Sequence, residues 1–156
     1  MKKHPEWQPE KPAPVMKSLG VLVGNWDLMG MHPMIPTGVR GRASFEWLDG
    51  DGLLIQRTDM EQPGPPNSVS AIGCDDSHQA FCMLYFDERG VSRIYSMSLE
   101  GNLWRMWRDA PGFSQRFTGT ISHDGNTITA LWEKSEDGST WEHDLELTYT
   151  RINREE

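Results

Sequence analysis

Hydrophobic and polar residues alternate along most of the chain with a period of two, which is typical of half-buried β-strands. The alternation is clearest near the C-terminus, where Trp141, His143, Leu145, Leu147 and Tyr149 share one face of a strand. Acidic and threonine residues occupy the positions between them. The pattern therefore predicts that this strand buries one face and exposes the other to water, as in an up-and-down barrel.

Turn sequences interrupt the alternation at short intervals. The Gly-containing turns lie at residues 49–52, 87–90, 100–102, 124–126 and 137–139, with a weaker signal at 75–78. Between them the pattern predicts strands at residues 21–30, 40–48, 53–60, 68–74, 80–86, 91–99, 103–108, 114–122, 127–135 and 141–151. An open sheet of this size would expose two long edges, so we predict an all-β fold, a closed antiparallel up-and-down β-barrel of about ten strands.

The remaining segments indicate a single domain. Residues 1–13 are polar and rich in proline and predict a flexible tail, while residues 14–156 form the barrel domain. The segment 14–19 begins with proline and predicts one helical turn. Two longer connections are expected at residues 31–39 and 61–67, and they would form the mouth of the barrel if both lay at one end.

Composition restricts the partners. The chain has a formal net charge of -8 and no run of Lys or Arg, which argues against a nucleic-acid partner. Cys74 and Cys82 form neither a disulfide framework nor a zinc motif, which fits a reducing compartment. The N-terminus lacks the apolar core of a signal peptide, and no apolar stretch is long enough to span a membrane. We therefore expect a cytoplasmic protein.

The first predicted strand carries a recognisable motif. Gly24 and Trp26 form a G-x-W sequence that resembles the start of the lipocalins and their calycin relatives. In that family the Trp closes the barrel floor and an Arg at the end of the last strand packs over its ring, a place that Arg151 matches. Residues 15–151 also resemble an uncharacterised group of bacterial lipocalin-like proteins, on the segments 44–50, 85–91 and 107–117. These resemblances imply a calycin-like barrel and assign no activity.

A more distant resemblance concerns His143. Nitrobindins are calycin barrels that bind heme through a single His on a late strand, and the alternation from His143 to Arg151 is similar in outline. The resemblance implies that His143 would be an iron ligand in a protein acting on reactive nitrogen species. Alternatively, His143 is a hydrogen-bonded interior residue or a general base. Apart from this heme, we predict no cofactor and no metal site.

Three arginines are candidates for holding an acidic ligand. Arg57, Arg93 and Arg116 lie in mid-strand positions, and Arg93 shares a face with Tyr95. Fatty-acid-binding proteins, which belong to the same superfamily, hold a carboxylate with interior Arg and Tyr side chains. A buried Arg needs a carboxylate from the ligand or from the protein, so an inward arginine here would have one or the other. The alternative is that these arginines point outward or pair internally.

Aromatic residues complete the predicted ligand site, and Trp47, Trp132 and Tyr149 are expected to wall it. The sequence has no nucleophile elbow, phosphate loop or zinc motif, so no catalytic residue is assigned and we expect a binding protein rather than an enzyme. Our first hypothesis is a cytoplasmic binding protein for a small hydrophobic molecule, with or without an acidic group. The alternatives are a nitrobindin-like heme protein and a structural or interaction domain without a ligand, for example a homodimer formed through an exposed apolar face.

Overall fold

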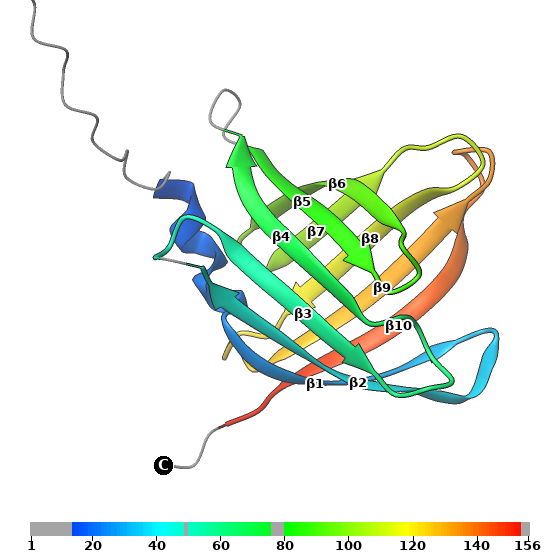
Figure 1. The fold of residues 1–156 in the computed structure, drawn as a ribbon, viewed down its shortest axis with the longest axis horizontal. Helices are drawn as coiled ribbons and strands as arrows, with labels where there is room; N and C mark the ends of the chain where they lie inside the picture. The colour runs from blue at the N-terminus through cyan, green and yellow to red at the C-terminus, as the bar shows by residue number, and fades with distance from the viewer. Residues whose placement is uncertain (1–13, 49, 76–79, 154–156) are drawn as a thin grey trace, which may run out of the picture.

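The computed structural model describes residues 14–48, 50–75 and 80–153; the predicted tail at residues 1–13 lies outside them. Ten antiparallel strands close into one barrel, and one short helix precedes them (Figure 1). The strands are β1 (Gly24–His32), β2 (Ile35–Trp47), β3 (Leu54–Met60), β4 (Ser68–Asp75), β5 (Ala80–Asp87), β6 (Ser92–Glu100), β7 (Leu103–Arg108), β8 (Ser114–Ile121), β9 (Thr127–Ser135) and β10 (Glu142–Arg151). The predicted all-β barrel is confirmed.

The closure of the sheet joins its first and last strands. Every strand pairs with its neighbours in the sequence, and β1 also pairs with β10. The register of this closing pair places Trp26 opposite Arg151 and Leu28 opposite Tyr149. Each strand therefore has a partner on both sides, so the barrel has no long open edge.

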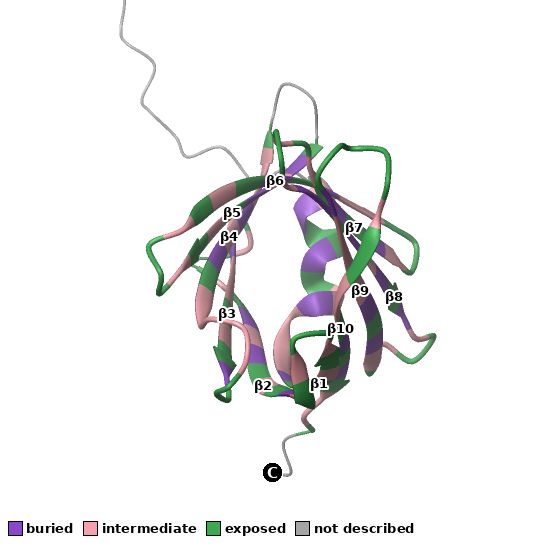
Figure 2. Ribbon diagram, turned by 90° about the vertical axis from the view of Figure 1, so that its right-hand side faces the viewer, coloured by how far each residue is buried: buried purple, intermediate pink, exposed green. Residues whose placement is uncertain are grey.

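The helix η1 (Pro14–Leu22) closes one end of the barrel. Figure 2 looks into the barrel from the opposite end and shows η1 lying across the far end, with buried stripes facing inward. Met16, Leu19 and Leu22 are buried in the core, and the Trp26 indole nitrogen donates a hydrogen bond to the Leu22 carbonyl at 2.9 Å. In the described part of the chain, no helix has the length and apolar character needed to cross a membrane.

The predicted long connection at residues 31–39 is wrong. β1 and β2 form a hairpin with a tight turn at residues 33–34, and β2 already begins at Ile35. The register shifts between Gly30 and His32, so that β2 carries extra residues at this point. A bulge accommodates Pro36, which cannot donate a ladder hydrogen bond, and Gly38, whose φ is +84°.

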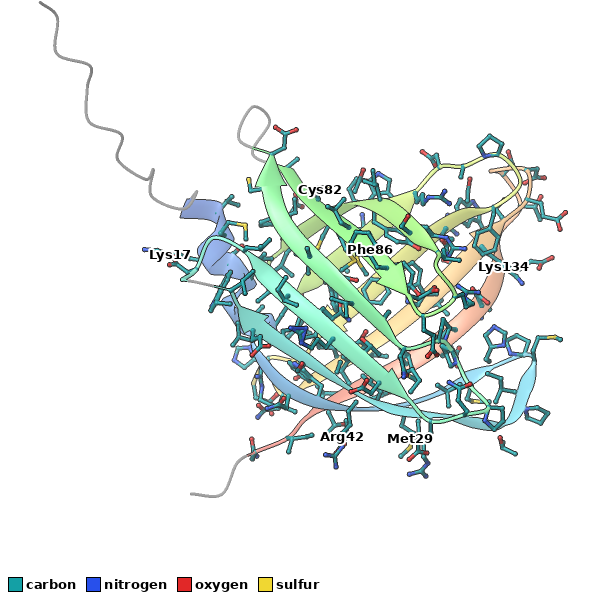
Figure 3. All side chains as sticks on the ribbon, viewed as in Figure 1. Lys17, Met29, Arg42, Cys82, Phe86 and Lys134 are labelled. Carbon is teal, nitrogen blue, oxygen red and sulfur yellow. The ribbon has the colours of Figure 1, made fainter. Side chains whose placement is uncertain are left out.

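Aromatic side chains fill the half of the barrel next to η1. Trp104 is fully buried and makes edge contacts with Phe45, Phe117 and Tyr149, at ring-centroid distances of 5.9, 4.6 and 6.1 Å. On the outer face, Met29 and Arg42 point away from the barrel (Figure 3). The interior cavity described below lies toward the opposite end of the barrel.

Candidate functional site

A cavity of about 380 Å³ occupies the end of the barrel opposite η1. Residues 64–66 of the connection between β3 and β4 line it, as do His32 and Ile35 beside the β1–β2 turn. The two segments that the sequence assigned to the mouth therefore border the same cavity, although the first is a hairpin turn rather than a long loop. A volume of this size falls at the lower end of the range for small-molecule sites, about 300–1,000 Å³.

The inner wall of the cavity is mainly apolar. Met83, Met106, Leu147 and Tyr149 line it and are buried. Trp132 adds an aromatic surface, and its ring lies 5.5 Å from that of Tyr95. Methionine side chains adapt to ligand shape, so this wall suits an apolar group without demanding one outline.

A pair of polar side chains lies within this apolar lining. The Tyr95 hydroxyl donates a hydrogen bond to the Gln115 side-chain oxygen at 2.8 Å, and Gln115 is 7% exposed. Burial raises the pKa of Tyr95, so its hydroxyl stays protonated at neutral pH. The bond fixes the direction of the hydroxyl and occupies the Gln115 side-chain oxygen.

Charged groups gather nearer the mouth, and one of the two arginines in the lining is already paired. His32 contacts the Asp144 carboxylate at 2.9 Å, and Arg89 contacts the Asp87 carboxylate at 2.8 Å. Arg93 lies over the Phe113 ring, 5.2 Å from its centroid, and has no described carboxylate within ion-pairing distance. The lining therefore holds one arginine, Arg93, that pairs with no described acidic residue.

Both ring nitrogens of His32 are engaged. Nδ1 accepts a hydrogen bond from the Met34 amide at 3.0 Å, and Nε2 bonds the Asp144 carboxylate. An acceptor at Nδ1 requires that the neutral ring carries its proton on Nε2, which then donates to Asp144. His32 thus ties the β1–β2 turn to β10 and offers neither nitrogen to a ligand.

Four of the predicted ligand-binding residues line the cavity: Arg93, Tyr95, Trp132 and Tyr149. Trp47 does not. It lies at the end of β2, pairs with Leu54 and packs half-buried against the core beside η1. The inward position predicted for Trp47 agrees with this packing, but its depth in the barrel removes it from the site.

The inward orientation considered for Arg57 and Arg116 is wrong. Arg57 is exposed and lies 3.8 Å from Glu46, while Arg116 bonds Glu133 at 2.9 Å and stacks 4.1 Å from the centroid of the Trp141 ring. Each arginine directly neighbours in sequence a residue that faces inward, so the alternation of its strand turns it outward. Both take the internal pairing that the sequence left open.

The inward register predicted for His143 is also wrong. Its side chain is 67% exposed and lies 4.0 Å from the Glu146 carboxylate. The pairing of β10 with β9 shifts register between His143 and Glu146, which places an extra residue in β10. A bulge of this kind inverts the alternation on one side of it, so Leu145, Leu147 and Tyr149 face inward while His143 faces outward.

The sequence interpretation missed several polar residues of the lining, namely Gln56, Thr58, Ser70, Tyr85 and Gln115. A signal for Gln115 was present, because it stands two positions before Phe117 and so shares its inward face. Tyr85 likewise stands two positions after the buried Met83 on β5 and so shares its inward face. Polar residues at inward-facing strand positions therefore indicate the lining of a cavity.

At the closed end, the Arg151 guanidinium lies over the Trp26 ring, 4.2 Å from its centroid, as the lipocalin resemblance implied. It also donates hydrogen bonds to the carbonyls of Val21, Val23 and Gly125. These contacts join η1, the β8–β9 turn and the last strand. Gly24, Trp26 and Arg151 therefore hold the floor of the barrel and lie outside the cavity lining.

No group of three or more His, Cys, Asp or Glu side chains within residues 14–48, 50–75 and 80–153 is placed to hold a metal ion. In comparisons with known proteins, neither a protein-family model nor a curated protein matches the sequence. Among solved structures, the chain is similar to the crystal structure of Rv2717c from M. tuberculosis, with a TM-score of 0.61 and 16% sequence identity. The match covers 92% of this chain and 100% of the other. At this identity the likeness shows that the two chains share a fold.

Proposed function

We propose that this protein binds a small amphipathic acid, whose apolar part occupies the barrel cavity and whose anionic group bonds Arg93. The observation that carries the proposal is the position of Arg93, a cation without a described carboxylate partner at the mouth of an apolar cavity. A binding role of this kind is also what the sequence resemblance to lipocalin-like and calycin barrels implies.

The geometry separates the two parts of such a ligand. Arg93 lies near the start of β6, beside the Phe113 loop at the mouth, whereas Leu147, Tyr149 and Met106 line the interior. A planar guanidinium bonds a carboxylate through two parallel N–H groups, which fixes the orientation of the acid. The alkyl or aromatic part then gains free energy by leaving water for the apolar wall.

Titration with a matched pair of amphiphiles tests this proposal. Decanoate and decan-1-ol differ in charge but have the same number of carbon atoms, and tryptophan fluorescence or calorimetry reports binding of either. Wild type should bind decanoate more tightly, and Arg93→Met should weaken decanoate binding about 10-fold to 100-fold, because hydrogen bonds to charged groups contribute about 1.5–3 kcal/mol. Decan-1-ol binding should change little.

Arg57→Met is the matched control, since Arg57 lies on the outer face of β3 and contacts no part of the cavity. It removes the same charge and should leave decanoate binding unchanged. Equal loss in Arg93→Met and Arg57→Met would mean that net charge, rather than a site, governs binding. No binding of either amphiphile to wild type would reject the proposal.

The described residues do not fit a heme held by His143. The ring lies on the outer face, and His32, the histidine that does line the cavity, has both nitrogens engaged. We therefore derive no function from heme.

One observation favours the interaction-domain alternative as a second candidate. Leu84, Phe86, Ile94 and Trp107 are exposed large hydrophobic residues on the outer face of β5, β6 and β7, around a shallow groove that Arg108 and Asp109 border. A two-fold related copy could pair the two charges reciprocally, as isologous interfaces require. Ile94→Glu should then convert a dimer to a monomer in light scattering, and a monomeric wild type at high concentration would reject this candidate.

A further inference from the structure

Asp87 is a carboxylate close to the proposed ligand anchor, and neighbouring side chains cover it. The pairing of β5 with β6 places Tyr85 opposite Arg93. Asp87 stands two positions after Tyr85 and so occupies the same face, one diagonal step from Arg93, within reach of a long side chain. Its side chain is fully buried, with 0% exposure. An ionised Asp87 is thus a competitor for the Arg93 guanidinium.

Other groups occupy this carboxylate. The Arg89 guanidinium bonds it at 2.8 Å, the Tyr85 hydroxyl donates to it at 2.8 Å, and the Arg89 amide donates at 2.9 Å. The Arg89 hydrogen bonds, with that of Tyr85, hold the pKa of Asp87 well below its usual range. Asp87 is therefore ionised at neutral pH, and Arg89 is the cation that balances it.

The turn between β5 and β6 makes this pairing local. Arg89 follows Asp87 by two residues. The backbone N–H of Arg89 donates a hydrogen bond to the Asp87 carboxylate, which fixes the start of the turn. Arg89 itself is about half exposed, with 53% of its side chain accessible, and it neutralises Asp87 while it borders the mouth of the cavity. Arg93 lines the same cavity, lies over the Phe113 ring and is left without a described acidic partner.

Removing Arg89 would change this balance. A carboxylate that loses its charge partner attracts the next cation within reach, and Arg93 lies one diagonal step away on the same face. We propose that Arg89 is a positioning residue that neutralises Asp87 and thereby keeps the Arg93 guanidinium available to an anionic ligand. This inference rests on the proposed function, since it assigns how the anionic group of the ligand is selected.

A consequence separates this role from a merely structural one. If Arg93 is drawn to Asp87, the cavity loses its preference for acids while its apolar wall is unchanged. Arg89→Met should therefore weaken decanoate binding about tenfold and leave decan-1-ol binding unaltered. Because Asp87 is the cause, Asp87→Asn in the same chain should restore decanoate binding in the Arg89→Met/Asp87→Asn double variant.

The experiment measures decanoate and decan-1-ol affinity for wild type, Arg89→Met and the double variant, with Arg57→Met as the control for charge. Thermal unfolding of each variant checks that the barrel is intact. Equal decanoate affinity in wild type and Arg89→Met would overturn the inference, as would a double variant that stays weak. Loss of both amphiphiles together in Arg89→Met would show a structural role and also overturn it.

A second readout needs no ligand. The Nε–Hε NMR signal of Arg93, assigned by its absence in Arg93→Lys, should shift in Arg89→Met and return to its wild-type position in the double variant. An unmoved signal in Arg89→Met would overturn the inference even if decanoate binds. Conversely, a shifted and restored signal without decanoate binding to wild type would reject the proposed function alone.

Discussion

The Arg151 guanidinium lies where a side chain on Gly24 would begin. A Cβ added to Gly24 would meet Arg151 Nη1 at 2.6 Å, and the φ of Gly24 is +132°, a conformation that favours glycine. Arg151 cannot easily move away, because it stacks on Trp26 and bonds three backbone carbonyls. The position of Arg151, at the end of the last strand, therefore explains why the first residue of the G-x-W motif is a glycine.

This relationship predicts a coupled pair of substitutions. Gly24→Ala should lower the free energy of unfolding by about 1–3 kcal/mol through backbone strain, with a further loss from the contact with Arg151. Arg151→Met should lower it by about 2–3 kcal/mol by removing hydrogen bonds to a charged group. In the double variant the contact disappears, so the combined loss should be smaller than the sum of the single losses. Urea unfolding of the four proteins measures the difference.

Arg151→Lys is the control for charge in this cycle. A single ammonium keeps the positive charge but cannot reproduce the planar stacking and the several hydrogen bonds, so an intermediate loss is expected. Additive losses in Gly24→Ala and Arg151→Met would contradict the proposed contact.

Two buried tryptophans differ in whether their indole N–H group has a hydrogen-bond partner, so we expect their replacement to have different effects on stability. Trp26 and Trp104 are both fully buried, but Trp26 Nε1 donates to Leu22, whereas Trp104 Nε1 has no hydrogen-bond partner among the described residues. Trp26→Phe should lose a hydrogen bond as well as volume, and Trp104→Phe should lose volume while removing an unsatisfied donor. Thermal unfolding should therefore show Trp26→Phe to be less stable than Trp104→Phe by about 1 kcal/mol or more. The reverse order would contradict the assignment.

The outward position of His143 predicts that this residue has little influence on the barrel interior. His143→Ala should change the free energy of unfolding by no more than about 0.5 kcal/mol, as is usual for exposed positions. Hemin added to either protein should give the same Soret spectrum. A saturable band at one equivalent that is lost in His143→Ala would show that the ring reaches an iron site and would contradict the register described above.

The two main differences between the sequence prediction and the structure have a common cause. The predicted connection at residues 31–39 rests on its Pro and Gly residues, the predicted orientation of His143 rests on a regular period of two, and both coincide with shifts of strand register. A bulge adds a residue without any change in hydrophobic pattern that a single sequence reveals, yet it inverts every side chain beyond it. The turns, by contrast, carry their own chemistry, and Gly90, Gly101, Gly125 and Gly138 adopt the positive φ that their sequences predicted.

The candidate site was predictable where alternation is regular. Arg93 and Tyr95 stand in β6 with Met97 on the same face, and the structure places Arg93 and Tyr95 in the cavity as that face requires. What the sequence could not supply is the pairing of charges across strands. The bond of Asp87 to Tyr85 and Arg89, and that of His32 to Asp144, depend on registers and turns that leave Arg93 unbalanced.

The hydrogen bonds of Asp137, in the loop between β9 and β10, predict that the fold loses stability in acid. Its carboxylate accepts hydrogen bonds from the amides of Thr140 and Ser139 and from the Ser135 hydroxyl, which lower its pKa from 3.8 to about 2. A group whose folded pKa is lowered stabilises the fold above its unfolded pKa, and this contribution is lost as the pH falls from about 4 through 2. Asp137→Asn should therefore lower Tm at pH 7 and differ less from wild type at pH 2.5.

The direct check is the pH titration of the Asp137 carboxyl carbon by NMR, with a midpoint expected at about 2. A midpoint near 3.8, or a Tm difference that grows as the pH falls, would contradict this account. Asp51→Asn provides a comparison, because Asp51 is a turn aspartate on the η1 side of the barrel and away from this loop.

The closing pair of β1 and β10 has a consequence for the order of events during synthesis. The ribosome releases β1 first among the strands and β10 last, at about 5–20 residues per second, so the partners of Trp26 and Leu28 emerge several seconds after them. Until then the nascent sheet can curl but cannot close, and the edges of β1 and β9 are open to other chains. The interval between the two strands is therefore the period in which a chaperone, or a neighbouring copy on the same messenger, has most access to this protein.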